Sequence, residues 1–282
     1  MRKKTGLVLE GGGMRGIYTA GVLDVFMEEG IHFDGVIGVS AGAIHGCSFV
    51  AEQKGRNIRY YKKYCNDKRF ISFWNFLRYG DIVGEEFCYH ELPEVLEPYD
   101  YDTFDASETE FYVTCSNLET GKAEYLKLTD MKAEIDLIRA SASLPYVSKV
   151  VEYNGMKLLD GGCTDSIPIR AFLEMGFLKS VVILTRDRDY IKKPENPHLP
   201  MIFFHKYPKF VKALGQRHIR YNKTRASIEK LEKSGKIFVI RPSEELNIGR
   251  MEKNPDEIQR IYDIGVKDAK HMLQSMKAWI EQ

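Results

Sequence analysis

The chain has 282 residues, of which 44% are hydrophobic and 29% are charged, and its formal net charge is +1. This length and composition suffice for a sizeable core and exclude a mainly disordered or fibrous protein. The balanced charge creates no overall field that would attract nucleic acid, so we predict no nucleic-acid partner. Five scattered cysteines without a C-x-x-C pair argue against a disulfide framework and a zinc site, and they favour a reducing compartment.

The N-terminus, Met1-Arg2-Lys3-Lys4-Thr5, is basic like the start of a signal peptide, but the apolar run after it covers only residues 7–9. No later apolar stretch is long enough to span a bilayer. We therefore predict a cytoplasmic protein whose only expected membrane contact is peripheral association. The sequence leaves the oligomeric state open, and no motif in it requires a cofactor.

The first expected strand, residues 7–10, leads into the loop Gly11-Gly12-Gly13-Met14-Arg15-Gly16 and a helix over residues 17–29. Consecutive glycines let backbone N–H groups point outward, so the loop can hold an anion or a developing oxyanion. The same glycines also fit the G-x-G-x-x-G pattern of a dinucleotide-binding oxidoreductase, with Asp34 as the ribose-binding acid. Against this alternative, Asp34 precedes the next expected strand, whereas the ribose-binding acid normally ends that strand.

The second expected strand, residues 36–39, runs into Gly38-Val39-Ser40-Ala41-Gly42 and a helix over residues 41–54. This is the G-x-S-x-G pattern of a nucleophile elbow, in which a tight strand-to-helix turn exposes the serine. Glycines on both sides leave room for the turn and for a substrate, and the helix dipole favours negative charge on the serine. We therefore predict that Ser40 is the nucleophile of a serine hydrolase.

Strand-like and helical runs continue to alternate along the chain, which indicates an α/β layout. An aromatic stretch at residues 70–79 is interpreted as core, and the alternative is that it walls a groove for an acyl chain. Further helices are expected at residues 58–68, 133–142 and 169–175. Further strands are expected at residues 110–117, 122–128, 147–153, 156–159, 181–185 and 237–241.

The strands at 147–153 and 156–159 are joined by Asn154-Gly155, a hairpin dipeptide, and the second strand ends at Asp160-Gly161-Gly162. An aspartate at a strand end, with permissive glycines behind it, can act as the general base for a serine on a neighbouring strand. The alternative is an ordinary turn-forming Asp-Gly pair.

The segment at residues 186–225 carries 11 Lys and Arg against three acidic residues, and it includes the apolar run Met201-Ile202-Phe203-Phe204. This composition suits a surface that contacts lipid headgroups. The preferred interpretation is a connector whose aromatic side chains pack on the core. Further along, Asn254 as a cap and Pro255 in the first turn predict a final amphipathic helix.

Four motifs together resemble those of bacterial patatin-like phospholipases, a family of serine acyl hydrolases. Residues 11–16 resemble the family's G-G-G-x-R-G loop, residues 38–42 its nucleophile motif, and residues 160–162 its D-G-G/A motif. Ala142-Ser143-Leu144-Pro145 resembles a further block of the family that contains alanine, serine and proline. The motifs occur in the family's order, and the resemblance covers residues 5–190.

The resemblance implies a three-layer α/β fold with a central, mostly parallel sheet and a mainly helical C-terminal appendage. It implies a catalytic domain at residues 1–190, and we expect residues 191–282 to pack on that core. It also implies a lipid or ester substrate and a catalytic dyad of Ser40 and Asp160 without a histidine. The implied oxyanion hole and elbow comprise Gly11, Gly12, Gly13, Arg15, Gly16, Gly38, Ala41 and Gly42.

Two further alternatives stay open at this point. His198, His205, His218 and His271 follow Asp160, so the chain order permits a Ser-Asp-His triad, but none sits in a recognisable strand-end loop with a flanking glycine. The chain could also be a lipid-binding homologue that has lost its chemistry, although both dyad residues and the glycine loop are present.

Overall fold

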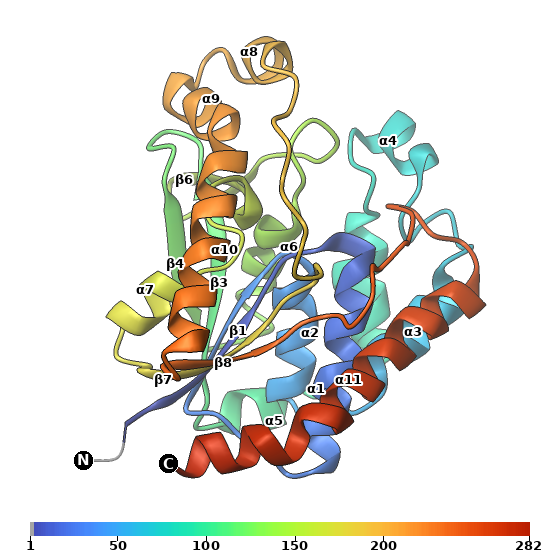
Figure 1. The fold of residues 1–282 in the computed structure, drawn as a ribbon. Helices are drawn as coiled ribbons and strands as arrows, with labels where there is room; N and C mark the ends of the chain where they lie inside the picture. Colours follow the sequence, from blue (N-terminus) through green and yellow to red (C-terminus); the bar gives the residue numbers. More distant parts are fainter. Residues whose placement is uncertain (1–2) are drawn as a thin grey trace.

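The computed structural model describes residues 3–282 and arranges them in three layers around one mixed sheet (Figure 1). The strand order is β5-β6-β3-β2-β1-β7-β8, and β4 pairs with β3. Strands β3, β2, β1, β7 and β8 are parallel to one another. β4 and β6 each pair antiparallel with β3, and β5 pairs antiparallel with β6. The strands are β1 (Thr5–Leu9), β2 (Gly35–Val39), β3 (Glu110–Asn117), β4 (Ala123–Leu128), β5 (Val151–Tyr153), β6 (Met156–Asp160), β7 (Lys179–Ile183) and β8 (Ile237–Ile240).

Alternating residues of each strand enter two different cores, as the period of a β-strand requires. Leu7 and Leu9 of β1 belong to the larger core, whereas Val8 between them belongs to the smaller core on the other face. The larger core is covered by α1 (Gly16–Glu28), α2 (Ala41–Val50), α3 (Arg56–Tyr64) and α11 (Pro255–Glu281). The smaller core is covered by α7 (Ile169–Glu174) and α10 (Arg217–Lys233). The central strands are thus buried on both faces, as expected for a parallel sheet.

The final helix packs directly against the first one. A side chain at Gly21 of α1 would place its Cβ 2.2 Å from the carbonyl oxygen of Tyr262, and one at Gly265 of α11 would place it 2.1 Å from that of Tyr18. Only glycine permits such a close backbone approach. The Tyr262 hydroxyl also donates to Asp24 at 2.7 Å. The end of the chain is therefore an integral part of the helical layer.

Residues beyond position 190 contribute to the sheet as well, because β8 pairs in parallel with β7. The predicted division of the chain after residue 190 stays a prediction. The shorter elements complete the fold: α4 (Phe73–Tyr79), the π-helix η2 (Phe87–Leu96), α5 (Tyr101–Ala106), α6 (Ile135–Ala142), α8 (His198–Phe204), α9 (Pro208–Gly215) and two short 3-10 turns, η1 (Gly13–Arg15) and η3 (Gly161–Cys163).

The expected strands and helices are present, but some bounds differ by up to four residues. The strand expected at residues 147–153 is limited to Val151–Tyr153, and the helices expected to end at residues 54 and 68 end at Val50 and Tyr64. The interpretation of residues 70–79 as core is wrong for half of the stretch. Phe70 is 5% exposed, but Phe73 and Leu77 are 59% and 71% exposed. The physical reason is that α4 projects beyond the end of the sheet (Figure 1), where no core lies beneath it. Within residues 3–282, no helix combines the length and apolar composition needed to cross a bilayer.

Candidate active site

Ser40 lies at the sharp turn between β2 and α2, with φ 54° and ψ −123°. A positive φ is costly for a residue with a Cβ, so the surrounding structure must hold this conformation. Two glycines make the turn sterically feasible. A Cβ at Gly38 would lie 2.5 Å from the Ala43 nitrogen, and one at Gly42 would lie 2.5 Å from the Leu9 carbonyl oxygen. The local geometry is that of the predicted nucleophile elbow.

A serine that the sequence analysis missed holds the backbone of the elbow. The Ser40 N–H donates to the Ser141 hydroxyl at 2.9 Å, and that hydroxyl donates to the Thr114 carbonyl at 2.8 Å. Ser141 is fully buried on α6. A signal was available, because Ala140-Ser141 immediately precedes the Ala142-Ser143 pair of the motif.

The sheet register places Asp160 beside Ser40. Val39, at the end of β2, pairs with Thr114 of β3, and Asp160, at the end of β6, pairs with the next residue of β3, Cys115. A strand has two edges for pairing, and β4 takes one edge of β3 at both Thr114 and Cys115. β2 and β6 must therefore share the other edge of β3. At Ser40 the chain turns out of the sheet, so β2 does not extend to Cys115. β6, which runs antiparallel to β3, pairs with β3 there instead.

The carboxyl group of Asp160 is buried, and its two oxygens differ in environment. Oδ1 accepts the Gly162 N–H at 2.7 Å, whereas Oδ2 has no hydrogen bond of normal geometry among residues 3–282. Burial raises the pKa of Asp160, and the nearby Ser40 hydroxyl and the Arg217 guanidinium oppose this shift. A buried carboxylate oxygen next to a serine hydroxyl is suited to accept a proton.

The segment that carries Asp160 is anchored on both sides. Its own N–H donates to the Ser143 carbonyl at 2.7 Å, and its carbonyl accepts the Ser116 hydroxyl at 2.7 Å. From α10, Arg217 Nε donates to the Gly162 carbonyl at 2.6 Å, and Arg220 binds the carbonyls of the residues that follow. Neither arginine was singled out from the sequence, because the motif residues give no indication that a helix more than 50 positions later packs on them.

The glycine loop borders the same site. A Cβ at Gly11 would lie 3.3 Å from the Ser40 Cβ, and one at Gly16 would lie 2.6 Å from the Ala41 Cβ, so the loop packs closely on the elbow. Gly13 has φ +56°, which favours glycine. The N–H groups of Gly12 and Gly13 donate to no other residue of the described chain. Free backbone donors beside a serine can bind a developing oxyanion.

Arg15 is part of this loop, and its side chain is partly buried. Burial, followed by the neighbouring Arg186, lowers the pKa of Arg15, while Glu10 opposes that shift. Glu10 in turn accepts the Thr185 N–H and the Tyr221 hydroxyl, both at 2.6 Å. A charged network of this kind can support the loop.

The structure separates Asp34 from the glycine loop. Asp34 precedes β2 and accepts the Thr5 N–H at 2.6 Å and its hydroxyl at 2.8 Å, at the start of β1. A dinucleotide binds at the carboxyl ends of the strands, and Asp34 lies at their amino ends. The dinucleotide alternative is therefore inconsistent with the fold.

Among residues 3–282, no histidine forms a hydrogen bond with Asp160. His205 is exposed, and its ring nitrogen meets only the Ile202 carbonyl of α8. The one fully buried histidine is His45, whose pKa is lowered by burial to about 4 and whose ring nitrogens have no partner within the described chain. The geometry gives no support to a Ser-Asp-His triad.

An apolar pocket begins at Ser40 and extends along α2 into the larger core. Its walls come from α2, α3, α6, η2 and the residues on either side of α4. Phe70 and Ile71 belong to these walls, so the first two residues of the aromatic stretch line a pocket. That this pocket holds an acyl chain stays a prediction. Other lining residues are Gly13, Met14, Ile44, Cys47, Tyr61, Ile82, Val83, Leu92, Met131 and Leu144. An elongated apolar chain fits such a pocket.

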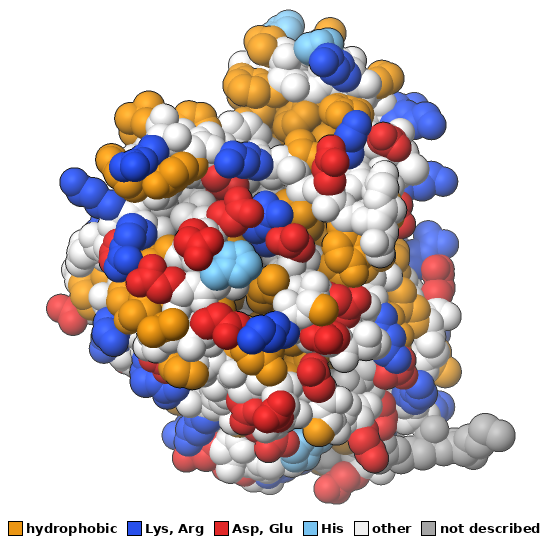
Figure 2. Space-filling model, turned by 180° about the vertical axis from the view of Figure 1, so that it is seen from behind, with side chains coloured by type: hydrophobic (Ala, Val, Ile, Leu, Met, Phe, Trp, Pro, Cys, Tyr) orange, Lys and Arg blue, Asp and Glu red, His pale blue; other side chains and the backbone are white. Residues whose placement is uncertain are grey.

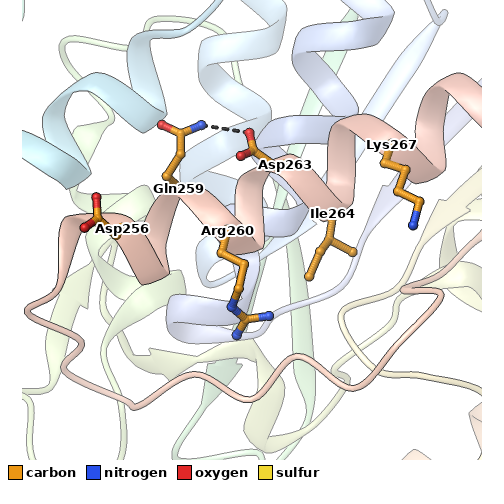
Figure 3. Close-up of a pocket in the computed structure, with 6 residues that line it drawn as sticks. All are labelled: Asp256, Gln259, Arg260, Asp263, Ile264 and Lys267. Carbon is orange, nitrogen blue, oxygen red and sulfur yellow. Dashed lines mark hydrogen bonds between the residues drawn. The ribbon is translucent and has the colours of Figure 1, made fainter.

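A second hollow lies on the outer surface of α11, and one side of this single helix forms it (Figure 3). Gln259 donates to Asp263 at 2.8 Å, and Arg260 binds Glu257 at 2.9 Å. All of its polar lining residues are partly or fully exposed to solvent, so the hollow has no buried titratable group of the kind expected in a catalytic site. Across residues 3–282, no group of three or more His, Cys, Asp or Glu side chains is placed to hold a metal ion.

A sequence model described as patatin-like phospholipase matches residues 7–173, which is more than half of the chain. The chain belongs to the patatin-like phospholipase family. The matched range of this patatin-like chain includes the glycine loop, the elbow, Ser141, Ser143 and Asp160. A separate model, described as a domain of unknown function (DUF6363), matches residues 207–281, which include α10, β8 and α11.

Several relatives are similar to parts or most of this chain. The uncharacterized protein YjjU of Escherichia coli is 34% identical over 185 residues, which cover 64% of this chain and 51% of YjjU. A protein named lysophospholipase nte1 from Aspergillus niger is 30% identical and covers 59% of this chain and 11% of its own length. Lysophospholipase NTE1 of Saccharomyces cerevisiae is 27% identical and covers 96% of this chain and 16% of its own length. The chain thus spans about half of one relative and a small part of the fungal ones.

Proposed function

We propose that this patatin-like chain hydrolyses carboxylic esters of lipids, with Ser40 as the nucleophile and Asp160 as the general base. The observation that carries the proposal is the buried, unpartnered Oδ2 of Asp160 next to a serine held at an elbow. The apolar pocket that begins at Ser40 adds a place for an acyl chain. The names of the fungal relatives agree with a lysophospholipid or a related phospholipid as substrate.

In the first half of the reaction, the Ser40 hydroxyl attacks the ester carbonyl carbon while Oδ2 of Asp160 takes the hydroxyl proton. The negative oxygen of the tetrahedral intermediate is bound by the free N–H groups of Gly12 and Gly13. When the intermediate collapses, the ester C–O bond breaks and the departing alkoxide receives the proton from Asp160. An acyl group is left on Ser40.

In the second half, Asp160 takes a proton from water, and the resulting hydroxide attacks the acyl-serine. Collapse of this intermediate returns the proton to the Ser40 oxygen and releases a carboxylic acid. A carboxylate is a weaker base than imidazole, so burial of Asp160, which raises its pKa, assists the proton transfer. An ester, with its better leaving group, is the expected substrate class rather than an amide.

The central test compares the parent with Ser40→Ala and Asp160→Asn on p-nitrophenyl esters and on lysophospholipid. Both variants are expected to lose at least about 1,000-fold in kcat/KM, because one removes the nucleophile and the other the proton acceptor. A fluorophosphonate probe is expected to label the parent at Ser40, as located by mass spectrometry. Full activity in Asp160→Asn would exclude the dyad. Lipid binding by a parent that turns over no ester would instead favour the non-enzymatic alternative.

We further propose that α4 and α8 contact a lipid surface around the pocket entrance. Both carry exposed apolar side chains at the end of the molecule where α4 and α8 project beyond the sheet (Figure 1). Figure 2 shows hydrophobic side chains gathered at the same end, over α8 at the top and over α4 at the upper left. The exposed side chains are Phe73, Trp74, Leu77 and Tyr79 of α4 and Leu199, Met201, Ile202 and Phe203 of α8.

Both patches lie next to residues that line the pocket. The residues on either side of α4, Ile71 and Ile82, line the pocket. On the α8 side, Leu144 lines the pocket, and the ring of nearby Tyr146 lies 5.3 Å from that of Phe203. Solvent-exposed apolar side chains next to basic residues are typical of interfacial binding. The segment at residues 186–225, which contains α8, supplies such basic residues. A cytoplasmic location stays a prediction.

This surface is tested with anionic phospholipid vesicles. Leu77→Glu and Ile202→Glu are expected to lower vesicle binding and hydrolysis of vesicle lipid by about tenfold or more each, and to leave hydrolysis of a soluble short ester nearly unchanged. Leu178→Glu serves as a matched control, since Leu178 is 52% exposed but precedes β7 at the opposite end of the sheet. Equal loss in all three variants would contradict docking through α4 and α8.

A further inference from the structure

A buried cation lies in the apolar pocket at a distance from Ser40. Arg56, at the start of α3, lines the pocket and is only 5% exposed. It lies near the far end of α2, where its Nη1 is 3.5 Å from the Ser48 hydroxyl. Since a helix rises about 1.5 Å per residue, the eight positions from Ser40 to Ser48 span about 12 Å. The cation therefore lies far along the pocket from the proposed nucleophile.

The Arg56 guanidinium has no anionic partner in the described chain. Its Nη2 donates to the Glu97 carbonyl at 2.9 Å, and the rings of Tyr60 and Tyr99 lie 5.4 and 5.2 Å from its central carbon. Its Nε has no hydrogen-bond partner, and the ion pairs among residues 3–282 include none with Arg56. Burying a charge without a counter-ion is costly, so such a group is poised for an anion that arrives with a ligand.

We infer that Arg56 forms a distal subsite for a carboxylate at the far end of a substrate acyl chain. This inference rests on the proposed ester hydrolysis and names its substrate class: medium-length acyl esters whose last carbon is a carboxylate. The methylene groups pack against the apolar pocket walls, and the guanidinium donates hydrogen bonds, including one from its free Nε–H, to the terminal carboxylate. A pocket with apolar residues alone would reject such a chain, because the carboxylate would lose its hydration without compensation.

The first experiment measures binding and does not depend on turnover. The Ser40→Ala protein is titrated by calorimetry with monomethyl sebacate and with methyl decanoate, which differ only in a carboxylate in place of the terminal methyl group. Comparable or tighter binding of the carboxylate is expected. Binding of methyl decanoate together with at least tenfold weaker binding of monomethyl sebacate would overturn the subsite, whatever the chain catalyses.

The second experiment compares kcat/KM of the full-length chain for the p-nitrophenyl monoester of sebacic acid and for p-nitrophenyl decanoate. The measured ratio is kcat/KM for the sebacic acid monoester divided by kcat/KM for the decanoate. Arg56→Met is expected to lower this ratio by at least about 30-fold, mainly through a higher KM for the sebacic acid monoester, and Arg56→Lys is expected to restore part of it. A purely structural role would lower both values together and leave the ratio unchanged, which would overturn the inference. If Arg56→Met does not fold, the ratio in the parent decides: a value of one or more supports the subsite, and a value below one tenth overturns it.

The two experiments separate this inference from the proposed function. Arg56-dependent binding of monomethyl sebacate without hydrolysis of either ester would contradict the proposed hydrolase function and support the distal subsite. Hydrolysis of the decanoate ester at Ser40 with rejection of the sebacate monoester would contradict the distal subsite and support the hydrolase function.

Discussion

Asp160 occupies the position beside Cys115 of β3 that Ser40 would occupy if β2 continued in a straight line. β2 pairs with β3 as far as Thr114, and β6 pairs with β3 from Cys115 onward. The sharp turn at Ser40 is therefore what makes room for the carboxylate. The strain at the elbow and the hydrogen bonds around it therefore bear directly on the proposed proton transfer from Ser40 to Asp160.

The first prediction concerns the pH dependence of hydrolysis. A general base acts in its deprotonated form, so kcat/KM falls as the pH decreases through the pKa of Asp160. Burial raises this pKa, and Arg217 lowers it. Arg217→Gln is therefore expected to move the acid limb of the kcat/KM profile to higher pH. Arg217→Lys keeps the charge and is expected to shift it less. Arg170→Gln, which removes a cation whose side chain is 90% exposed, is expected to leave it in place. A shift to lower pH in Arg217→Gln would argue against Asp160 as the base.

The second prediction concerns backbone strain at Ser40. Its φ of 54° and ψ of −123° favour glycine. Ser40→Gly is expected to be more stable than Ser40→Ala by about 1 kcal/mol in urea unfolding followed by circular dichroism. The same pair of substitutions at Ser48, inside α2, is the control, and there glycine is expected to be the less stable variant by about 1 kcal/mol. The same order at both positions would show that the elbow is unstrained.

The third prediction concerns Ser141. Its hydroxyl accepts the Ser40 N–H and donates to the Thr114 carbonyl, so Ser141→Ala leaves two buried backbone groups without a partner. We expect a loss of stability of about 1–3 kcal/mol and a fall in kcat of about tenfold with little change in KM. Ser143→Ala is the comparison. Ser143 contacts Asp160 through its backbone carbonyl, and its side chain binds only the Arg139 carbonyl. A smaller fall in kcat is expected there, and equal falls would argue against the role of Ser141.

The fourth prediction concerns Gly12. Its φ of −160° is open to any residue, so backbone restriction does not explain the glycine. The reason is space, since a Cβ would lie 2.8 Å from the Thr185 Oγ1 and 3.1 Å from its Cγ2. Gly12→Ala is expected to lower kcat by about 100-fold, because the clash displaces oxyanion donors. Adding Thr185→Ala, which removes both atoms, is expected to restore part of the activity. No recovery in the double variant would contradict this explanation.

The sequence was sufficient to predict most of the architecture and the motifs of the site. Alternating apolar runs predicted the strands and their order along the chain. The glycine patterns around Ser40 and Asp160 predicted which residues stand at strand ends. These features are local, since a strand or a turn is specified by residues a few positions apart.

Other features depend on contacts between distant segments, and only the tertiary structure determined them. Ser141 and Arg217 support the proposed dyad from 101 and 57 positions away from Ser40 and Asp160. No local pattern marks Arg217, and the position of Ser141 beside the Ala142-Ser143 pair gives no indication that it binds the backbone of Ser40. The exposure of α4 was mispredicted because aromatic spacing specifies a helical face but not whether a core lies under it.

The sequence by itself determined which groups carry the proposed chemistry: a serine and an aspartate at strand ends, with glycines beside them. The tertiary structure decided how these groups meet, because the register of β2 and β6 along β3 brings Asp160 to Ser40. It also decided that Arg56 is buried at a distance from Ser40 in the same pocket. Burial and register are properties of the packed sheet and helices, and they arise only when residues far apart in the chain come together.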